Sequence, residues 1–266
     1  MNKILFLFLC LVIIACNNIP NEKKNTRIKS ALPEEIKSLI QLSNQFPDSV
    51  GLHLRLVNAM DSIGDYSNAL HEMDQMIQKD SGNFGLWYRK AALKTLIKDT
   101  VGAIHAYNMA ASIYASPDAM LALANLYAET KNKRSLILCS QVEDLRMGRT
   151  YQAHCDFISG IYFSRTGNYS SAVQSFNQCI LNNYTYMEAY MEKGFIFYDK
   201  KQFDEAIKIF QTVITIKNNY PDGYYWLGKC FEAKNNRHAA SENYEKAFSL
   251  DHQLHEAETA IKRLKN

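Results

Sequence analysis

The sequence predicts an all-α protein made of repeated helical hairpins, and the main evidence is a period of 34 residues in its last third. Gly160, Gly194 and Gly228 are separated by this interval. The same interval relates three further series: Ala172, Ala206 and Ala240; Phe163, Phe197 and Phe231; and Phe176, Phe210 and Tyr244. A fixed period of this length is typical of tandem helix–turn–helix units, because one hairpin is too small to bury its own apolar face. The composition agrees, since 47% of the 266 residues are hydrophobic and only 11 Gly and 5 Pro are present to interrupt helices.

These residues resemble the tetratricopeptide repeat (TPR) family, position by position. In that family a small residue at position 8 of each unit faces a small residue at position 20, where the two helices of the hairpin cross closely. The glycine series falls on position 8 and the alanine series on position 20. The resemblance covers about residues 50–254. It implies a right-handed α-solenoid, an α-α superhelix, and a non-catalytic scaffold or adaptor that binds a protein or peptide partner in its concave groove.

The expected elements follow in order along the chain. A first helix is expected within 31–49, where Pro33 suits a first helical turn and apolar residues recur at helical spacing, as in half of a repeat. Six units are then expected at 50–83, 84–116, 117–150, 153–186, 187–220 and 221–254. A last helix within 255–266, apolar on one face and basic near its end, would cap the array and keep it soluble.

The third unit, 117–150, is expected to be degenerate. Its second helix places Leu136, Ser140 and Glu143 at the repeat's positions 20, 24 and 27, and two extra residues precede the next unit. Two interpretations remain open. The unit is either a drifted repeat, which we favour, or a bend at 136–152 that divides the array.

The N-terminus resembles the signal of a bacterial lipoprotein. Lys3 gives a basic start, and the apolar run 4–14 is too short to span a bilayer as a mature helix. The run ends in Ile-Ile-Ala before Cys16, as in the lipobox. In that family residues 1–15 are removed and the new terminal cysteine is acylated, for example with palmitate. The alternative is an ordinary secretory signal followed by a chance cysteine.

The resemblance implies that Cys16 anchors the protein to a membrane of the bacterial cell envelope. Residue 17 is Asn rather than Asp, which in enterobacterial lipoproteins implies the outer membrane, facing the periplasm. Residues 17–30 are polar and are expected to form a flexible tether.

Four cysteines follow the expected anchor: Cys139, Cys155, Cys179 and Cys230. They have no CxxC spacing and no paired histidine, so no metal site is expected among them. A disulfide would be compatible with an oxidising envelope. The repeat register, however, places none of these positions opposite another.

No motif for catalysis or cofactor binding is present. The sequence contains no HExxH, GxSxG, P-loop or GxGxxG pattern, so neither an enzyme, a cofactor nor a small-molecule substrate is expected. The net charge is +3 without a clustered basic face, which disfavours nucleic acid. Two alternatives to the adaptor stay open. One is a metal-dependent module using 136–152 and the pair His252 and His255, and the other is a structural spacer in an envelope assembly.

The resemblance also implies a partner-binding groove. In TPR arrays, positions 2, 5, 9, 12 and 13 of the first helices line the concave surface. Read from the register, the expected groove residues are Tyr88, Leu121, Asn125, Phe157, Ile161, Met191, Phe195, Tyr198, Tyr225 and Lys229. An aromatic and apolar strip of this kind is typical of a partner site, unless the helices bury it against one another. Of the residues with which TPR domains bind a terminal carboxylate, only Asn58 is matched, so an extended or helical apolar peptide is expected.

Overall fold

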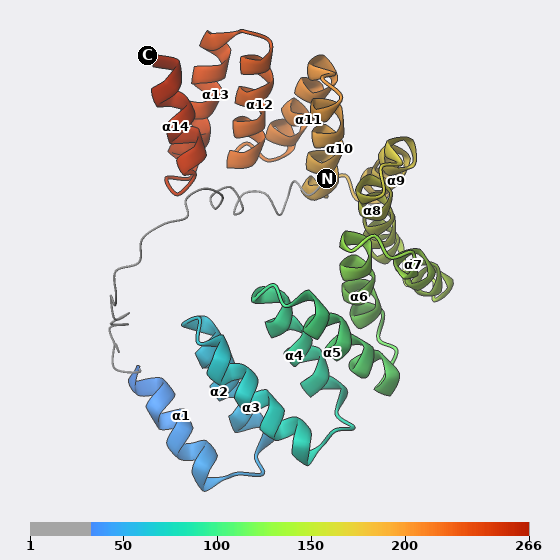
Figure 1. Cartoon of the computed structure of the whole chain (residues 1–266), viewed down its shortest axis with the longest axis vertical. Helices are drawn as coiled ribbons and strands as arrows, with labels where there is room; N and C mark the ends of the chain where they lie inside the picture. The colour runs from blue at the N-terminus through green and yellow to red at the C-terminus, as the bar shows by residue number, and fades with distance from the viewer. Residues whose placement is uncertain (1–32, 266) are drawn as a thin grey trace, which may run out of the picture. The chain divides into compact units, whose positions relative to one another are not determined.

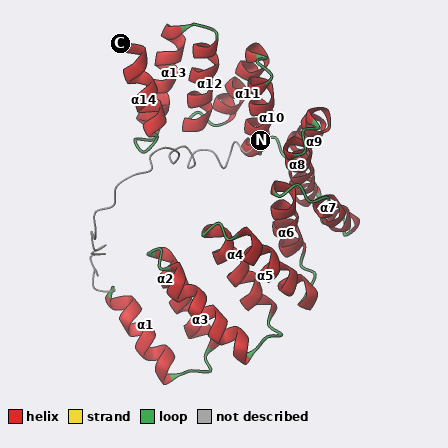
Figure 2. Cartoon of the chain, in the orientation of Figure 1, coloured by secondary structure: helices red, strands yellow, loops and turns green. Residues whose placement is uncertain are grey.

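The computed structural model describes residues 33–265, and these residues form fourteen α-helices and no strand (Figures 1 and 2). The predicted signal at 1–16, with its lipidation site Cys16, and the predicted tether at 17–30 lie outside the described residues. None of the helices in the described part is long and apolar enough to cross a membrane. The all-α prediction is confirmed.

Twelve of the helices form consecutive pairs, with a single helix at each end. The helices are α1 (Glu34–Gln45), α2 (Val50–Ser62), α3 (Tyr66–Lys79), α4 (Phe84–Leu96), α5 (Thr100–Ile113), α6 (Pro117–Glu129), α7 (Arg134–Asp144), α8 (Arg149–Arg165), α9 (Tyr169–Asn182), α10 (Met187–Asp199), α11 (Phe203–Ile216), α12 (Pro221–Ala233), α13 (Arg237–Leu250) and α14 (His255–Lys265). The chain divides between Leu123 and Ala124, inside α6, into two compact units. The division therefore lies outside the irregular stretch at 136–152.

The turn inside each of the six pairs has the same backbone conformation. One residue of each turn has a positive φ: Gly64, Lys98, Lys131, Gly167, Lys201 and Asn235. The next residue donates its N–H to a carbonyl five positions earlier, as Asp99 does to Lys94 at 2.9 Å. This hydrogen bond satisfies a free carbonyl at the end of the first helix. In four of the turns the same residue also caps the second helix, through the side chains of Asp65, Asp99, Asn168 and Asn236.

The packing inside the last three pairs depends on the glycine series. A Cβ on Gly160 or Gly194 would lie 2.4 Å from the ring of Phe176 or Phe210, and a Cβ on Gly228 would lie 2.7 Å from the ring of Tyr244. The glycine therefore makes room for the aromatic residue at position 24. Ala172, Ala206 and Ala240 at position 20 are fully buried, and their facing position 8 stays a prediction.

The third pair keeps the repeat but shifts its core by one position. The positive-φ residue Lys131 has the same place in its unit as Lys98 has in the preceding one, but the next helix begins more tightly. Ser135 donates to Asn132 three positions earlier at 3.1 Å, whereas Ala103 donates to Asp99 four positions earlier at 2.9 Å. The inner stripe of α7 is accordingly Ser135, Cys139 and Val142. The expected core positions lie outside the core: Leu136 is half-buried, and Ser140 and Glu143 are exposed. Because one residue corresponds to about 100° of rotation about the helix axis, this tighter start of the helix accounts for the shift of one position.

Candidate partner-binding surface

The ten predicted groove residues separate into two groups by burial. Leu121, Ile161, Met191 and Phe195 are buried. These four side chains are packed against neighbouring helices instead of lining an open groove, so little of their surface is accessible to a partner. The other six are half-buried: Tyr88, Asn125, Phe157, Tyr198, Tyr225 and Lys229. Contact between a partner and any of these residues stays a prediction.

The half-buried groove residues are divided between the two compact units. Tyr88 lies in the unit before Leu123, where it stacks on Phe84 with ring centroids 5.6 Å apart. In the other unit, Phe157 stacks on Tyr186 with centroids 4.9 Å apart, and the Tyr186 hydroxyl lies 3.0 Å from His154 Nδ1. Only Tyr198, Tyr225 and Lys229 are brought together around one point.

Lys229 on α12 lies against three aromatic rings, and we call these four residues the lysine–aromatic cluster. Its Nζ is 4.5 Å from the ring centroid of Trp226, 5.4 Å from that of Tyr198 and 5.8 Å from that of Tyr225. Such distances allow cation–π attraction between the ammonium and the faces of the rings. Tyr225 and Trp226 precede Lys229 by four and three positions, so one face of α12 presents all three side chains. This helical spacing could have identified Trp226, which the groove positions alone missed.

Contacts around the cluster hold the Tyr225 ring in place, and burial keeps the phenol groups of Tyr198 and Tyr225 protonated. Tyr225 packs on Tyr244 with centroids 5.6 Å apart. The Tyr244 hydroxyl donates to Glu232 at 2.7 Å, and Arg263 of α14 also donates to this carboxylate at 2.6 Å. Burial, with a smaller contribution from the charge of Glu256, raises the pKa of Tyr225 to about 12. Burial also raises the pKa of Tyr198, so both phenols are neutral hydrogen-bonding groups at neutral pH.

An ionic triad around the buried Arg165 lies beside the predicted groove, and no sequence motif indicated it. Arg165, at the end of α8, donates to Glu192 of α10 at 3.1 and 3.2 Å and to Glu129 of α6 at 2.9 and 3.1 Å. The side chains of Arg165 and Glu192 are each only 3% exposed. Burial raises the pKa of Glu192, although the hydrogen bonds and the charge of Arg165 oppose this rise. Although burial opposes the change, the two carboxylates raise the pKa of Arg165, so the guanidinium stays charged.

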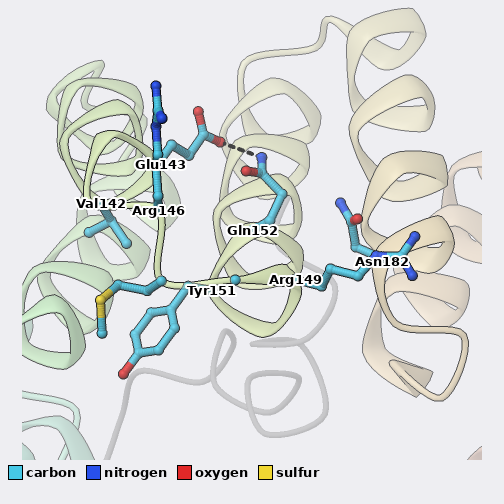
Figure 3. Close-up of a pocket in the computed structure, with 9 residues that line it drawn as sticks. Val142, Glu143, Arg146, Arg149, Tyr151, Gln152 and Asn182 are labelled. Carbon is cyan, nitrogen blue, oxygen red and sulfur yellow. Dashed lines mark hydrogen bonds between the residues drawn. The ribbon is translucent and has the colours of Figure 1, made fainter.

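A shallow pocket of about 310 Å³ lies at the irregular stretch between α7 and α8 (Figure 3). It is lined by Val142, Glu143, Arg146, Met147, Gly148, Arg149, Tyr151, Gln152 and Asn182. Gln152 Nε2 donates to Glu143 Oε1 at 2.8 Å, as the dashed line in Figure 3 shows. Partial shielding of the carboxyl group from solvent raises the pKa of Glu143, although its side chain is exposed overall. Arg149 and Asn182 lie at the other side of the pocket from this pair.

The residues suggested for a metal-dependent module are not assembled into a ligand set. His252 Nδ1 lies 2.6 Å from the carbonyl of Phe248, and His255 Nδ1 is 4.0 Å from Glu258. Within residues 33–265, no group of three or more His, Cys, Asp or Glu side chains is placed to hold a metal ion.

Comparisons with known proteins identify the repeats. Residues 194–235 match a family model described as TPR repeat, and residues 221–253 match one described as tetratricopeptide repeat. The chain therefore carries tetratricopeptide repeats in this region, and the family resemblance is confirmed there. A curated relative, "Tetratricopeptide repeat protein 1" of Schizosaccharomyces pombe, is 23% identical over 257 residues, which are 86% of this chain and 24% of the relative. The chain thus spans about a quarter of that relative's length.

Solved structures share the same fold. A tetratricopeptide repeat protein from Parabacteroides merdae is 17% identical with a TM-score of 0.71, and the match covers 87% of this chain and 91% of that one. PilW, a widely conserved type IV pilus biogenesis factor, is 15% identical with a TM-score of 0.64, covering 81% of this chain and 98% of PilW. At these identities the similarity establishes the fold. The protein is a TPR-type helical repeat scaffold, a class that typically mediates protein interactions.

Proposed function

We propose that this protein is a non-catalytic adaptor whose lysine–aromatic cluster binds a segment of a partner protein. The observation that carries the proposal is Lys229, held within 6 Å of three rings on two neighbouring helices. Aromatic anchors contribute most of the binding energy at protein interfaces. The half-buried rings of Tyr198 and Tyr225 suit apolar side chains of a partner, and the ammonium of Lys229 suits a carboxylate on the same segment.

The adaptor is proposed to act at a bacterial envelope, attached through lipid on Cys16 and facing the periplasm from the outer membrane. The lipobox-like sequence supports the anchor. The polar stretch 17–30 would then connect the anchor to the repeats. PilW, a type IV pilus biogenesis factor, has a similar fold. A role for the present protein in the assembly of an envelope structure would be consistent with the proposed attachment.

The binding proposal is tested with a pair of matched lysine substitutions. Lys229→Gln removes the charge of the cluster. The control, Lys208→Gln, removes an exposed charge from α11, where this lysine forms an ion pair with Glu205 three positions away. Both variants and the native chain would be crosslinked in intact envelopes and co-purified after their thermal stabilities are shown to be equal. We expect at least about tenfold lower recovery of the partner with Lys229→Gln alone, since 1.4 kcal/mol of lost binding gives this factor.

Equal recovery with both variants would contradict the cluster as the binding site. It would favour the structural spacer, for which Cys16→Ser should disturb the assembly while substitutions in the cluster have no effect. Phe195→Glu is a poor probe for this purpose. Phe195 is buried with its ring centroid 4.5 Å from that of Trp226, so a carboxylate there would destabilise the core as well as the surface.

A further inference from the structure

Cys139 and Cys155 contact each other across two packed helices, which the repeat register did not anticipate. The Cys155 Sγ donates to the carbonyl oxygen of Cys139 at 3.5 Å, and both side chains are buried. The neighbouring Cys155 thiol and burial together raise the pKa of Cys139 well above its ordinary value. The one-residue shift in α7 explains the pairing, because it turns Cys139 instead of Ser140 toward α8.

We propose that Cys139 and Cys155 are a disulfide-forming pair that links α7 to α8 in an oxidising environment. The oxidant is a disulfide of a small thiol or of a thiol–disulfide oxidoreductase. One cysteine thiolate attacks this disulfide, releasing one thiol and forming a mixed disulfide; the second cysteine then attacks the mixed disulfide and releases the second thiol. The two protein thiols lose two electrons and two protons in total, and the oxidant receives them as its two thiol groups.

The helix that carries Cys139 is weakly held, which gives the oxidant access. α7 has 11 residues and buries only Ser135, Cys139 and Val142. Three large apolar side chains in α7 or directly after it are exposed to solvent: Ile137 is 53% exposed, Leu145 50% and Met147 51%. Helices with few buried contacts open most readily. Opening exposes both thiols and removes the burial that disfavours the reactive thiolate of Cys139.

The crosslink would then restrain this weak helix. It closes a short segment, since the two cysteines are 16 positions apart, and it acts on α7 and the irregular stretch that follows. Cys179 and Cys230 provide internal controls, because they lie buried on α9 and α12 and burial raises the pKa of each to about 12.

The test is oxidation of the full folded chain with a series of oxidised and reduced glutathione ratios, followed by trapping of thiols, trypsin digestion and mass spectrometry. Trypsin leaves Cys139 alone in peptide 135–146 and Cys155 alone in peptide 150–165. We expect these two peptides joined in most molecules under oxidising ratios, in the native chain and in Cys179→Ser, but not in Cys155→Ser. Unfolding of the linked protein in urea should be roughly tenfold slower or more, and reduction should reverse this change.

Three results would overturn the inference. The peptides could remain unlinked at every ratio, Cys139 could be joined to a cysteine other than Cys155, or the link could form only in urea and prevent refolding. Unfolding rates in Cys155→Ser separate a stabilising crosslink from a general effect of glutathione, because this variant should unfold at one rate in all the buffers.

Discussion

At the scale of single residues, each of the last three hairpins depends on a glycine that faces an aromatic ring. We expect Gly194→Ala to destabilise the protein by about 1–3 kcal/mol, because its Cβ would lie 2.4 Å from the Phe210 ring and the buried ring cannot move away without strain. Gly51→Ala is the matched control. Nothing lies within 4 Å of a Cβ at this exposed position of α2, so alanine should be neutral or stabilise by up to about 1 kcal/mol. Urea unfolding measures both changes, and equal effects would contradict this account.

The glycine period was visible in the sequence, but the residue that each glycine faces was not. The period shows that a small residue recurs at this position. Which side chain lies opposite that residue depends on how the two helices cross. The same limit applies to the surface. The family positions identified Tyr198, Tyr225 and Lys229, and they also included Ile161 and Met191, which are 1% and 4% exposed. Helix positions give the direction of a side chain, while its exposure depends on how closely the next helix packs.

At the scale of the element, the hairpin turns require a left-handed residue, and three of the six use lysine. Lys201 has a φ of 59°, a conformation that costs a residue with a Cβ about 1 kcal/mol or more. Lys201→Gly should therefore stabilise the protein by roughly 0.5–1 kcal/mol. Lys208→Gly, inside α11, should instead destabilise it by about 1 kcal/mol. Thermal unfolding of the two variants should show shifts of opposite sign, and destabilisation by Lys201→Gly would show that this turn is not limited by backbone strain.

The helices themselves were predictable from the sequence, because apolar spacing and turn residues act locally. Each of the six expected ranges contains a pair of helices, although α8 begins at Arg149, before the expected start at residue 153. The third pair shows where local reasoning stops. A tighter first turn after Lys131 keeps the helix but changes which of its side chains are buried, so Cys139 contacts Cys155. A register of exact repeats does not contain this shift, so it places neither cysteine opposite the other.

At the scale of the whole molecule, the ionic triad connects helices from three successive pairs. Arg165 of α8 is hydrogen-bonded to both Glu129 of α6 and Glu192 of α10. The side chains of Arg165 and Glu192 are almost inaccessible to solvent, whereas that of Glu129 is 37% exposed. Such a group contributes little net stability when intact, but removing its only cation leaves a carboxylate buried without a partner. The triad therefore makes the packing of these three helices depend on one arginine.

We expect Arg165→Leu to destabilise residues 124–265 by about 3–5 kcal/mol at neutral pH. Burial already raises the pKa of Glu192, and the substitution removes the hydrogen bonds that oppose this rise. A carboxyl group with a raised pKa in the folded state favours folding below its ordinary pKa, and this contribution is lost as the pH rises through the folded value. The destabilisation should therefore be smaller at about pH 4.5 than at pH 8. Adding Glu192→Gln should recover much of the lost stability and reduce the pH dependence.

The two tryptophans allow this prediction to be measured in each compact unit. Trp87 lies in the unit before Leu123 and Trp226 in the unit after it, and the sequence contains only these two. Single-tryptophan variants, Trp226→Phe and Trp87→Phe, would report urea unfolding of the two units separately. Because each repeat is stabilised mainly by its own contacts and those of its immediate neighbours, Arg165→Leu should lower the midpoint reported by Trp226 more than that reported by Trp87. Equal shifts would mean that the array unfolds as one cooperative body, and the effect of the triad would then extend beyond the helices that hold it.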